Sequence, residues 1–165
     1  MKKRFAGMWI LGFVAGLLLA VNTPWNIHAE EKLTNGTCGE SATWEYNTQT
    51  KTLTIRGAGV VSGGDFQGAD WFFEKNANKI QKLVISEGIT SISGETFRDG
   101  AMKEVALPDT LKEIGANAFY HCQSLKRITI PEGVTAVGSG VFTSCRDLSY
   151  VKLPKTLKTN PNKIG

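Results

Sequence analysis

Residues 111–131, LKEIGANAFYHCQSLKRITIP, and residues 134–154, VTAVGSGVFTSCRDLSYVKLP, are two copies of one pattern. Aliphatic residues, glycine, phenylalanine, cysteine and proline recur at the same places in both copies, 23 residues apart. A shorter copy runs from Ile89 to Pro108, and half a copy covers 80–88. A fixed period of about 20 to 50 residues indicates a solenoid, in which each unit buries its apolar face against the next. Solenoids present a surface, so the pattern favours a binding protein over an enzyme.

Each copy predicts one strand followed by a tight return. Ile128 and Ile130 alternate with polar residues, as in a strand, and Pro131 ends it because proline cannot donate a ladder hydrogen bond. Gly138 permits a turn, and 139–145 is expected to be a short helical or irregular piece. Stacking should place equivalent residues in interior columns: Phe97, Phe119 and Phe142 in one, and Ile85, Leu107, Ile130 and Leu153 in another.

The segment 30–79 precedes the repeats and is expected to form a β cap over their first, otherwise open, apolar end. Trp44 and Tyr46, then Leu53 and Ile55, alternate with polar residues on either side of a turn at 47–50, which predicts a hairpin. Residues 30–37 are expected to be frayed, and the glycines between 57 and 64 to form a loop. The aromatic run 71–73 is expected to pack within the cap; a carbohydrate-stacking platform is the alternative.

The first 29 residues have the layout of an export signal. Three basic residues precede the apolar stretch Phe5–Val21, and Ala29 offers a cleavage point. Cleavage would leave 30–165 as one secreted or cell-surface domain; an uncleaved signal, the alternative, would be its one membrane contact. Losing Lys2, Lys3 and Arg4 reduces 19 basic residues to 16, against 15 acidic ones. With no basic stripe and interleaved aromatics, no nucleic-acid partner is expected.

The sequence offers little for catalysis, and no catalytic, cofactor-binding or metal-binding residue is predicted. His121 is the one histidine after signal removal, and neither a metal-ligand cluster nor a phosphate-binding glycine loop is present. Cys122 and Cys145 hold the same repeat position, so they should lie on adjacent rungs of the stack, about 4.8 Å apart. A disulfide prefers a Cβ separation of about 3.8 Å, so two free thiols are favoured. Cys38 has no evident partner, and its disulfide state stays open.

The binding prediction concerns the strand residues that alternate away from the core. Such residues should form one exposed, mixed-charge face, with Arg127 and Tyr150 as anchors because Arg and Tyr are enriched at binding hot spots. The alternative is that this face is only solvated. Tyr120 and His121, at another edge, form a second candidate. The predicted face comprises Lys82, Glu104, Arg127, Thr129, Tyr150 and Lys152, with Val84 and Ala106 between them.

The repeat resembles the BspA-type (treponemal) leucine-rich repeat, whose unit reads roughly L-x-x-I-x-I-P-x-x-V-x-x-I-G-x-x-A-F-x-x-C. The pattern is found over 125–145 and again over 102–122. Thr96 and Val141 depart from it where the family has Ala, and Gly100 departs where the family has Cys. The resemblance implies a leucine-rich-repeat solenoid, mainly β with short helical or 3₁₀ segments, over 80–165. It also implies a bacterial surface or secreted protein associated with adhesion.

These observations predict a secreted or cell-surface module that binds an extracellular protein or host-surface ligand without catalysis, and with no cofactor. The alternative is the targeting part of a larger extracellular hydrolase, which would bind cell wall or glycan; a structural spacer is a third reading. The unit that begins at Leu157 lacks an aliphatic residue at Asn160, and the end 160–165 does not read as a cap. We therefore expect the chain to be a fragment of a longer repeat protein.

Overall fold

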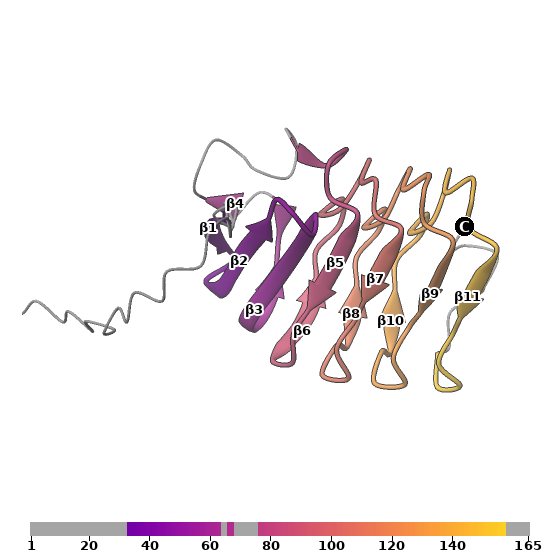
Figure 1. Ribbon diagram of the computed structural model, residues 1–165. Helices are drawn as coiled ribbons and strands as arrows, with labels where there is room; N and C mark the ends of the chain where they lie inside the picture. Colours follow the sequence, from indigo (N-terminus) through magenta and orange to yellow (C-terminus); the bar gives the residue numbers. More distant parts are fainter. Residues whose placement is uncertain (1–32, 64–65, 68–75, 158–165) are drawn as a thin grey trace, which may run out of the picture.

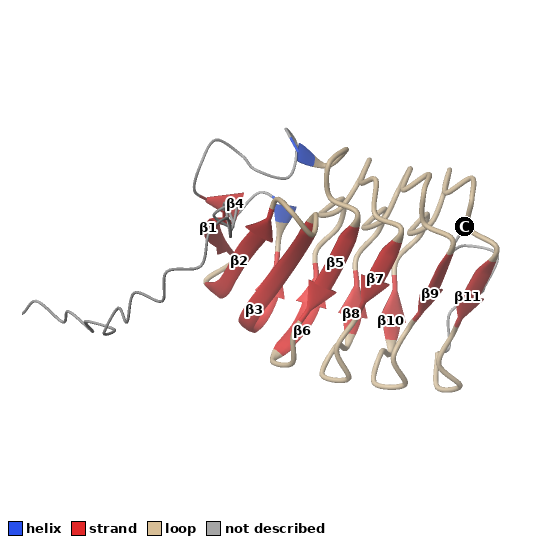
Figure 2. Ribbon diagram, in the orientation of Figure 1, coloured by secondary structure: helices blue, strands red, loops and turns tan. Residues whose placement is uncertain are grey.

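The computed structural model describes residues 33–63, 66–67 and 76–157, and it is mainly β (Figure 1). In this part of the chain helical conformation is limited to Gly63 and Asn76 (Figure 2), and no helix has the length and apolar character to cross a bilayer. The segment 139–145, expected to be helical or irregular, consists of turns. The aromatic run 71–73 lies outside the described residues. The strands are β1 (Leu33–Cys38), β2 (Ser41–Asn47), β3 (Thr52–Val61), β4 (Phe66–Gln67), β5 (Lys82–Ile85), β6 (Ile89–Ile92), β7 (Glu104–Ala106), β8 (Glu113–Ile114), β9 (Arg127–Thr129), β10 (Ala136–Val137) and β11 (Tyr150–Lys152).

The predicted hairpin is confirmed in β2 and β3, which pair antiparallel from Ser41 opposite Ala58 to Asn47 opposite Thr52. The inward residues of both strands are buried, Trp44 at 1% exposure. In the turn, the Asn47 side-chain oxygen accepts hydrogen bonds from the backbone N–H groups of Gln49 and Thr50, both at 2.9 Å. Asparagine favours turns through this bonding.

Two expectations for the N-terminal region are wrong. Part of the segment expected to be frayed forms β1, which pairs antiparallel with β2 on one side and with β4 on the other. The glycines expected to form a loop instead lie partly within β3: Gly57 and Gly59 have φ values of 112° and 83°. A Cβ at Gly57 would lie 2.1 Å from the Ser41 carbonyl oxygen, so only glycine fits there.

Strand β3 starts both parallel ladders of the repeat region, and its register against β6 shifts between Gly59 and Val60. The first half of β3 pairs in parallel with β5, from Thr52 opposite Lys82 to Ile55 opposite Ile85. The second half pairs in parallel with β6. The first ladder continues from β5 to β7 and, after β9, to β11, with β7 and β9 side by side (Figure 1). The second ladder continues through β8 and β10. The repeats that supply β5 to β10 therefore each add one strand to each ladder, and β11 extends the first ladder.

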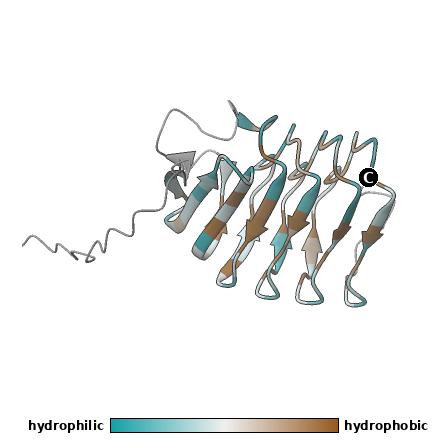
Figure 3. Cartoon of the chain, viewed as in Figure 1, coloured by the Kyte–Doolittle hydropathy of each residue, from teal (hydrophilic) through white to brown (hydrophobic). Residues whose placement is uncertain are grey.

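The core lies between the two ladders, and the predicted phenylalanine column is present. The Phe97 and Phe119 rings stack with centroids 5.5 Å apart, and the Phe119 and Phe142 rings stack at 6.0 Å. All three are buried. The aliphatic column is buried at Ile85 and Ile130 and half-buried at its other two members, Leu107 and Leu153. Polar residues gather in the turns at the rims, whereas apolar residues lie mainly along the strands (Figure 3).

The turns that follow the first-ladder strands are tied together by carboxylates. Glu87 accepts hydrogen bonds from the backbone N–H groups of Asp109 and Thr110, at 3.0 and 3.2 Å. Glu132 accepts one from the N–H of Lys155, at 3.0 Å. Each carboxylate thus satisfies turn donors of the next repeat that would otherwise need water.

Candidate functional site

The residues predicted to form a binding face lie together on the outer side of the first ladder. All six are exposed, whereas Leu83 and Ile128, between them in the strands, are buried. The strand register places Lys82 beside Glu104, Arg127 beside Tyr150, and Thr129 beside Lys152. The predicted alternation and exposure are therefore present, and binding of a ligand at this face stays a prediction.

Among the described residues of this face, one cation is paired with a carboxylate and two others are not. Lys82 Nζ lies 3.4 Å from Glu104 Oε2, with both side chains largely exposed. Within the described residues, Arg127 and Lys152 form no ion pair. Tyr150, beside Arg127, is 54% exposed, unusually open for a large apolar side chain. This face therefore exposes two cations without an ion pair in the described part of the chain, together with an aromatic ring.

The face continues onto the N-terminal hairpin, which sequence reasoning did not propose as part of the site. Because paired residues of parallel strands point to the same side, Thr52 and Thr54 of β3 extend the rows of Lys82 and Val84. An ion pair of 2.7 Å joins Arg56 to Glu45 in this region. An open hollow of about 420 Å³ is lined by Asn35, Gly36, Thr37, Thr43, Trp44, Glu45, Thr54 and Arg56. The polar residues that alternate with the apolar ones along the hairpin could have predicted this hollow from the sequence.

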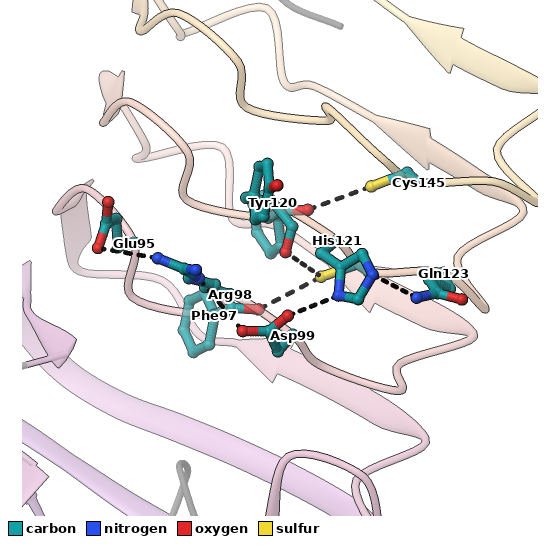
Figure 4. A network of polar contacts seen from close by, with 10 residues as sticks. Glu95, Phe97, Arg98, Asp99, Tyr120, His121, Gln123 and Cys145 are labelled. Atoms are coloured by element: carbon teal, nitrogen blue, oxygen red, sulfur yellow. Dashed lines mark hydrogen bonds and ion pairs between the residues drawn. The ribbon is translucent and has the colours of Figure 1, made fainter.

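The second candidate, Tyr120 and His121, belongs to a polar network at a turn edge (Figure 4). His121 Nδ1 lies 2.6 Å from Asp99 Oδ1, and Gln123 contacts His121 Nε2. Arg98 pairs with Asp99 at 3.2 Å and lies over the Tyr120 ring at 5.2 Å. Side chains from two neighbouring repeats are thereby held in fixed positions.

This network contains a carboxylate–histidine pair, a combination that also occurs in catalytic triads. Asp99, His121 and Ser144 occupy one repeat position in successive units and share a left-handed backbone, with φ of 60°, 59° and 64°. In an acid–histidine–serine triad, the second imidazole nitrogen bonds to the serine. Here Gln123 contacts that nitrogen, and within the described residues no hydrogen bond joins Ser144 to His121. Both nitrogens of the His121 ring are therefore held by polar side chains of the turn edge.

The two repeat cysteines are free thiols. Cys122 Sγ donates to the Phe97 carbonyl at 3.3 Å, and Cys145 Sγ donates to the Phe119 carbonyl at 3.1 Å. Contact with the Cys145 thiol, together with burial, raises the pKa of Cys122, while the Cys122 thiol lowers the pKa of Cys145. Cys145 is also the more exposed of the two. Among the described residues, no group of three or more His, Cys, Asp and Glu side chains could hold a metal ion.

Comparison with known proteins agrees with this architecture. The model of the BspA-type leucine-rich repeat region, which represents six copies of the repeat, matches residues 69–164. The chain belongs to the BspA-type leucine-rich repeat family. The resemblance carried by the repeat motif is thus confirmed, together with a mainly β, leucine-rich-repeat-like fold.

Two solved structures of bacterial leucine-rich-repeat proteins are similar to this chain. A leucine-rich cell surface protein from Faecalibacterium prausnitzii matches 76% of this chain and 35% of its own, with 18% identity and a TM-score of 0.60. A leucine-rich repeat protein from Eubacterium ventriosum matches 76% of this chain and 45% of its own, with 17% identity and a TM-score of 0.48. This BspA-type chain therefore spans less than half the length of either structure. No curated protein matches it.

Proposed function

We propose that this chain is a secreted or cell-surface binding module that holds an extracellular protein against the outer face of its first ladder, without catalysis. Residues 1–29 would direct export, 30–79 would cap the apolar end, and 80–165 would form the solenoid. Membership in the BspA-type family supports this proposal, and a structure that shares the fold is described as a cell surface protein.

One observation carries the proposal: the predicted residues lie side by side on a single exposed face whose inner side is a packed core. The strands hold this face in place, so a partner would not have to order loops on binding. Such preorganisation lowers the entropic cost of association. Arg127 and Tyr150 are the proposed anchors because they are adjacent, exposed and chemically suited to hot spots.

The test is binding of the purified chain to an array of host matrix proteins, mucins and glycans. A saturable protein ligand is expected, and Arg127→Ala with Tyr150→Ala should weaken its binding at least tenfold. The matched control is Lys112→Ala with Glu113→Ala, which truncates two exposed residues at the second ladder. Unchanged binding by the Arg127 and Tyr150 variant, with the fold retained, contradicts the assignment of the face.

The hollow on the hairpin favours a second function, targeting of a larger extracellular hydrolase to cell wall or glycan. Its lining includes one amide and three hydroxyl side chains, from Asn35, Thr37, Thr43 and Thr54. These groups can both donate to and accept from sugar hydroxyls. A glycan ligand lost on Thr43→Val with Thr54→Val, and retained by Arg127→Ala, would support this function over the first.

A further inference from the structure

The charges of the repeat region are segregated, although their sum is nearly neutral. Residues 76–157 contain ten Lys and Arg residues and eight Asp and Glu residues. Five of the ten cations lie on the outer face of the first ladder or at the residue before its strands, with Glu104 the one carboxylate there. The five are Lys82, Lys103, Lys126, Arg127 and Lys152.

Among the described residues, four of these cations have no ionic partner. Glu104 pairs with Lys82 at 3.4 Å, and Lys103, Lys126, Arg127 and Lys152 form no ion pair in the described part of the chain. Asp147, which precedes β11, pairs with none of them. We call these four residues the cationic strip.

Four of the eight carboxylates of 76–157 are engaged at turns. Glu87 and Glu132 bind the backbone of neighbouring turns. Glu95 and Asp99 hold Arg98 at the opposite turn edge. Half of the acidic groups of this region therefore serve its turns, and the face proposed to bind keeps a net positive charge. The strand register places Arg127 beside Tyr150 and Lys152 beside Thr129, so no ionic contact in the described part of the chain accounts for these two cations.

We propose that the cationic strip binds an acidic protein segment, with Tyr150 and Ala106 receiving apolar side chains of that segment. The proposal rests on the function argued above and names the chemistry of the partner. From β7 to β11 the strip crosses two strand spacings, about 10 Å. Carboxylates three residues apart lie on one side of a segment in polyproline II conformation, which has about three residues per turn and rises about 3.1 Å per residue, so their separation of about 9 Å matches this span.

A protein segment fits the face better than a polyanionic glycan. Val84 is half-exposed and Ala106 exposed, and Tyr150 is open beside Arg127. These groups offer apolar contact that a sulfated sugar could not use fully. The charge should accelerate encounter and set orientation, while the apolar contacts slow dissociation.

The test uses the full chain and three fluorescent peptides in which Glu-Gly-Leu, Glu-Gly-Gly or Lys-Gly-Leu is repeated four times, with heparin as the polyanionic glycan. The Glu-Gly-Leu peptide should bind at least about fivefold more tightly than Glu-Gly-Gly, and Lys-Gly-Leu should not bind. Affinity should fall about tenfold or more between 50 and 500 mM salt because exposed charges are screened. Arg127→Glu with Lys152→Glu should weaken binding at least tenfold.

The matched control reverses two cations outside the strip, Lys112→Glu with Lys155→Glu, and should change affinity less than twofold. Equal effects of the two pairs would show that only net charge matters and would overturn the proposal. So would tighter binding of heparin than of the Glu-Gly-Leu peptide, or no peptide binding by the folded chain. If the array ligand still needs Arg127 and Tyr150 while the acidic peptide does not bind, this inference fails and the proposed function stands. A chain that binds nothing on the array removes both.

Discussion

Replacing Phe119 by alanine is the sharpest test of how the repeats cohere. The Phe119 side chain is fully buried, and its ring stacks on Phe97 at 5.5 Å and on Phe142 at 6.0 Å. Phe142 is 5% exposed, and the described column ends at its ring. The two positions therefore share residue type and repeat position but differ in the number of ring contacts.

The magnitudes follow from burial and ring contacts. Truncation of a buried phenylalanine to alanine costs about 3–5 kcal/mol, including the cavity left behind. An aromatic pair contributes about 0.5–1.5 kcal/mol beyond its buried area. Phe119→Ala loses two pairs and should cost about 4–5 kcal/mol, whereas Phe142→Ala loses one and should cost about 3–4 kcal/mol. Against a total stability of about 5–15 kcal/mol, the first change brings the domain near its unfolding threshold.

Urea unfolding of the full chain, followed by circular dichroism, measures both costs. The slope m should stay constant, so that midpoints report stability. Phe119→Leu is the control, because it keeps most of the volume and loses only ring geometry, at about 1–1.5 kcal/mol. A cost below about 2 kcal/mol for Phe119→Ala, or an equal or larger cost for Phe142→Ala, would refute a continuous aromatic column.

Three further predictions concern the thiols, a turn carboxylate and a glycine. An aromatic disulfide reagent should react quickly with Cys145 and slowly with Cys122, because Cys145 is more exposed and its pKa is lowered. The expected result is a single fast-reacting thiol that is lost in the Cys145→Ser variant. The pKa of Glu87 is held below its ordinary value of 4.5, chiefly by the hydrogen bond that its carboxylate accepts from the backbone N–H of Asp109. The ionised Glu87 side chain therefore stabilises the fold fully above pH 4.5, and this stabilisation is lost as the pH falls through the lowered pKa. The difference in urea midpoint between wild type and Glu87→Gln should therefore close on acidification; a constant difference would contradict this. Gly115→Ala should cost about 1–3 kcal/mol because its Cβ would lie 2.4 Å from the Gly94 backbone nitrogen; an unchanged midpoint would show that the backbones can separate.

The features predicted correctly are those that repeat or alternate. The phenylalanine column follows from equal spacing along the chain, since equal spacing in a stack means contact between neighbours. The outer face follows from the two-residue period of a strand, which places Arg127 and Tyr150, at equivalent positions of successive repeats, on the same side of the sheet. Such arguments need only the sequence and the geometry of a strand.

The features that were missed depend on pairing between segments that share no pattern. The sequence of β1, LTNGTC, has no run of alternating apolar residues, and its strand conformation comes from pairing with β2 and β4. The close approach of Gly57 to Ser41 and the register shift between Gly59 and Val60 both depend on neighbouring strands, so the local sequence could not predict them. The Asp99–His121 contact joins variable positions of two repeats, so apolar periodicity could not predict it.

The contrast between inner and outer positions also indicates which residues can determine binding specificity. Inner positions such as Phe119 touch the repeats on both sides, so changes there propagate along the stack. Outer positions such as Arg127 and Lys152 contribute no ion pair within the described residues, and substitutions at surface sites of this kind usually change stability by no more than about 0.5 kcal/mol. The charge of the outer face can therefore vary without disturbing the fold. If a ligand binds to the outer face, substitutions there should change the affinity for the ligand, whereas substitutions in the core should change the stability of the fold.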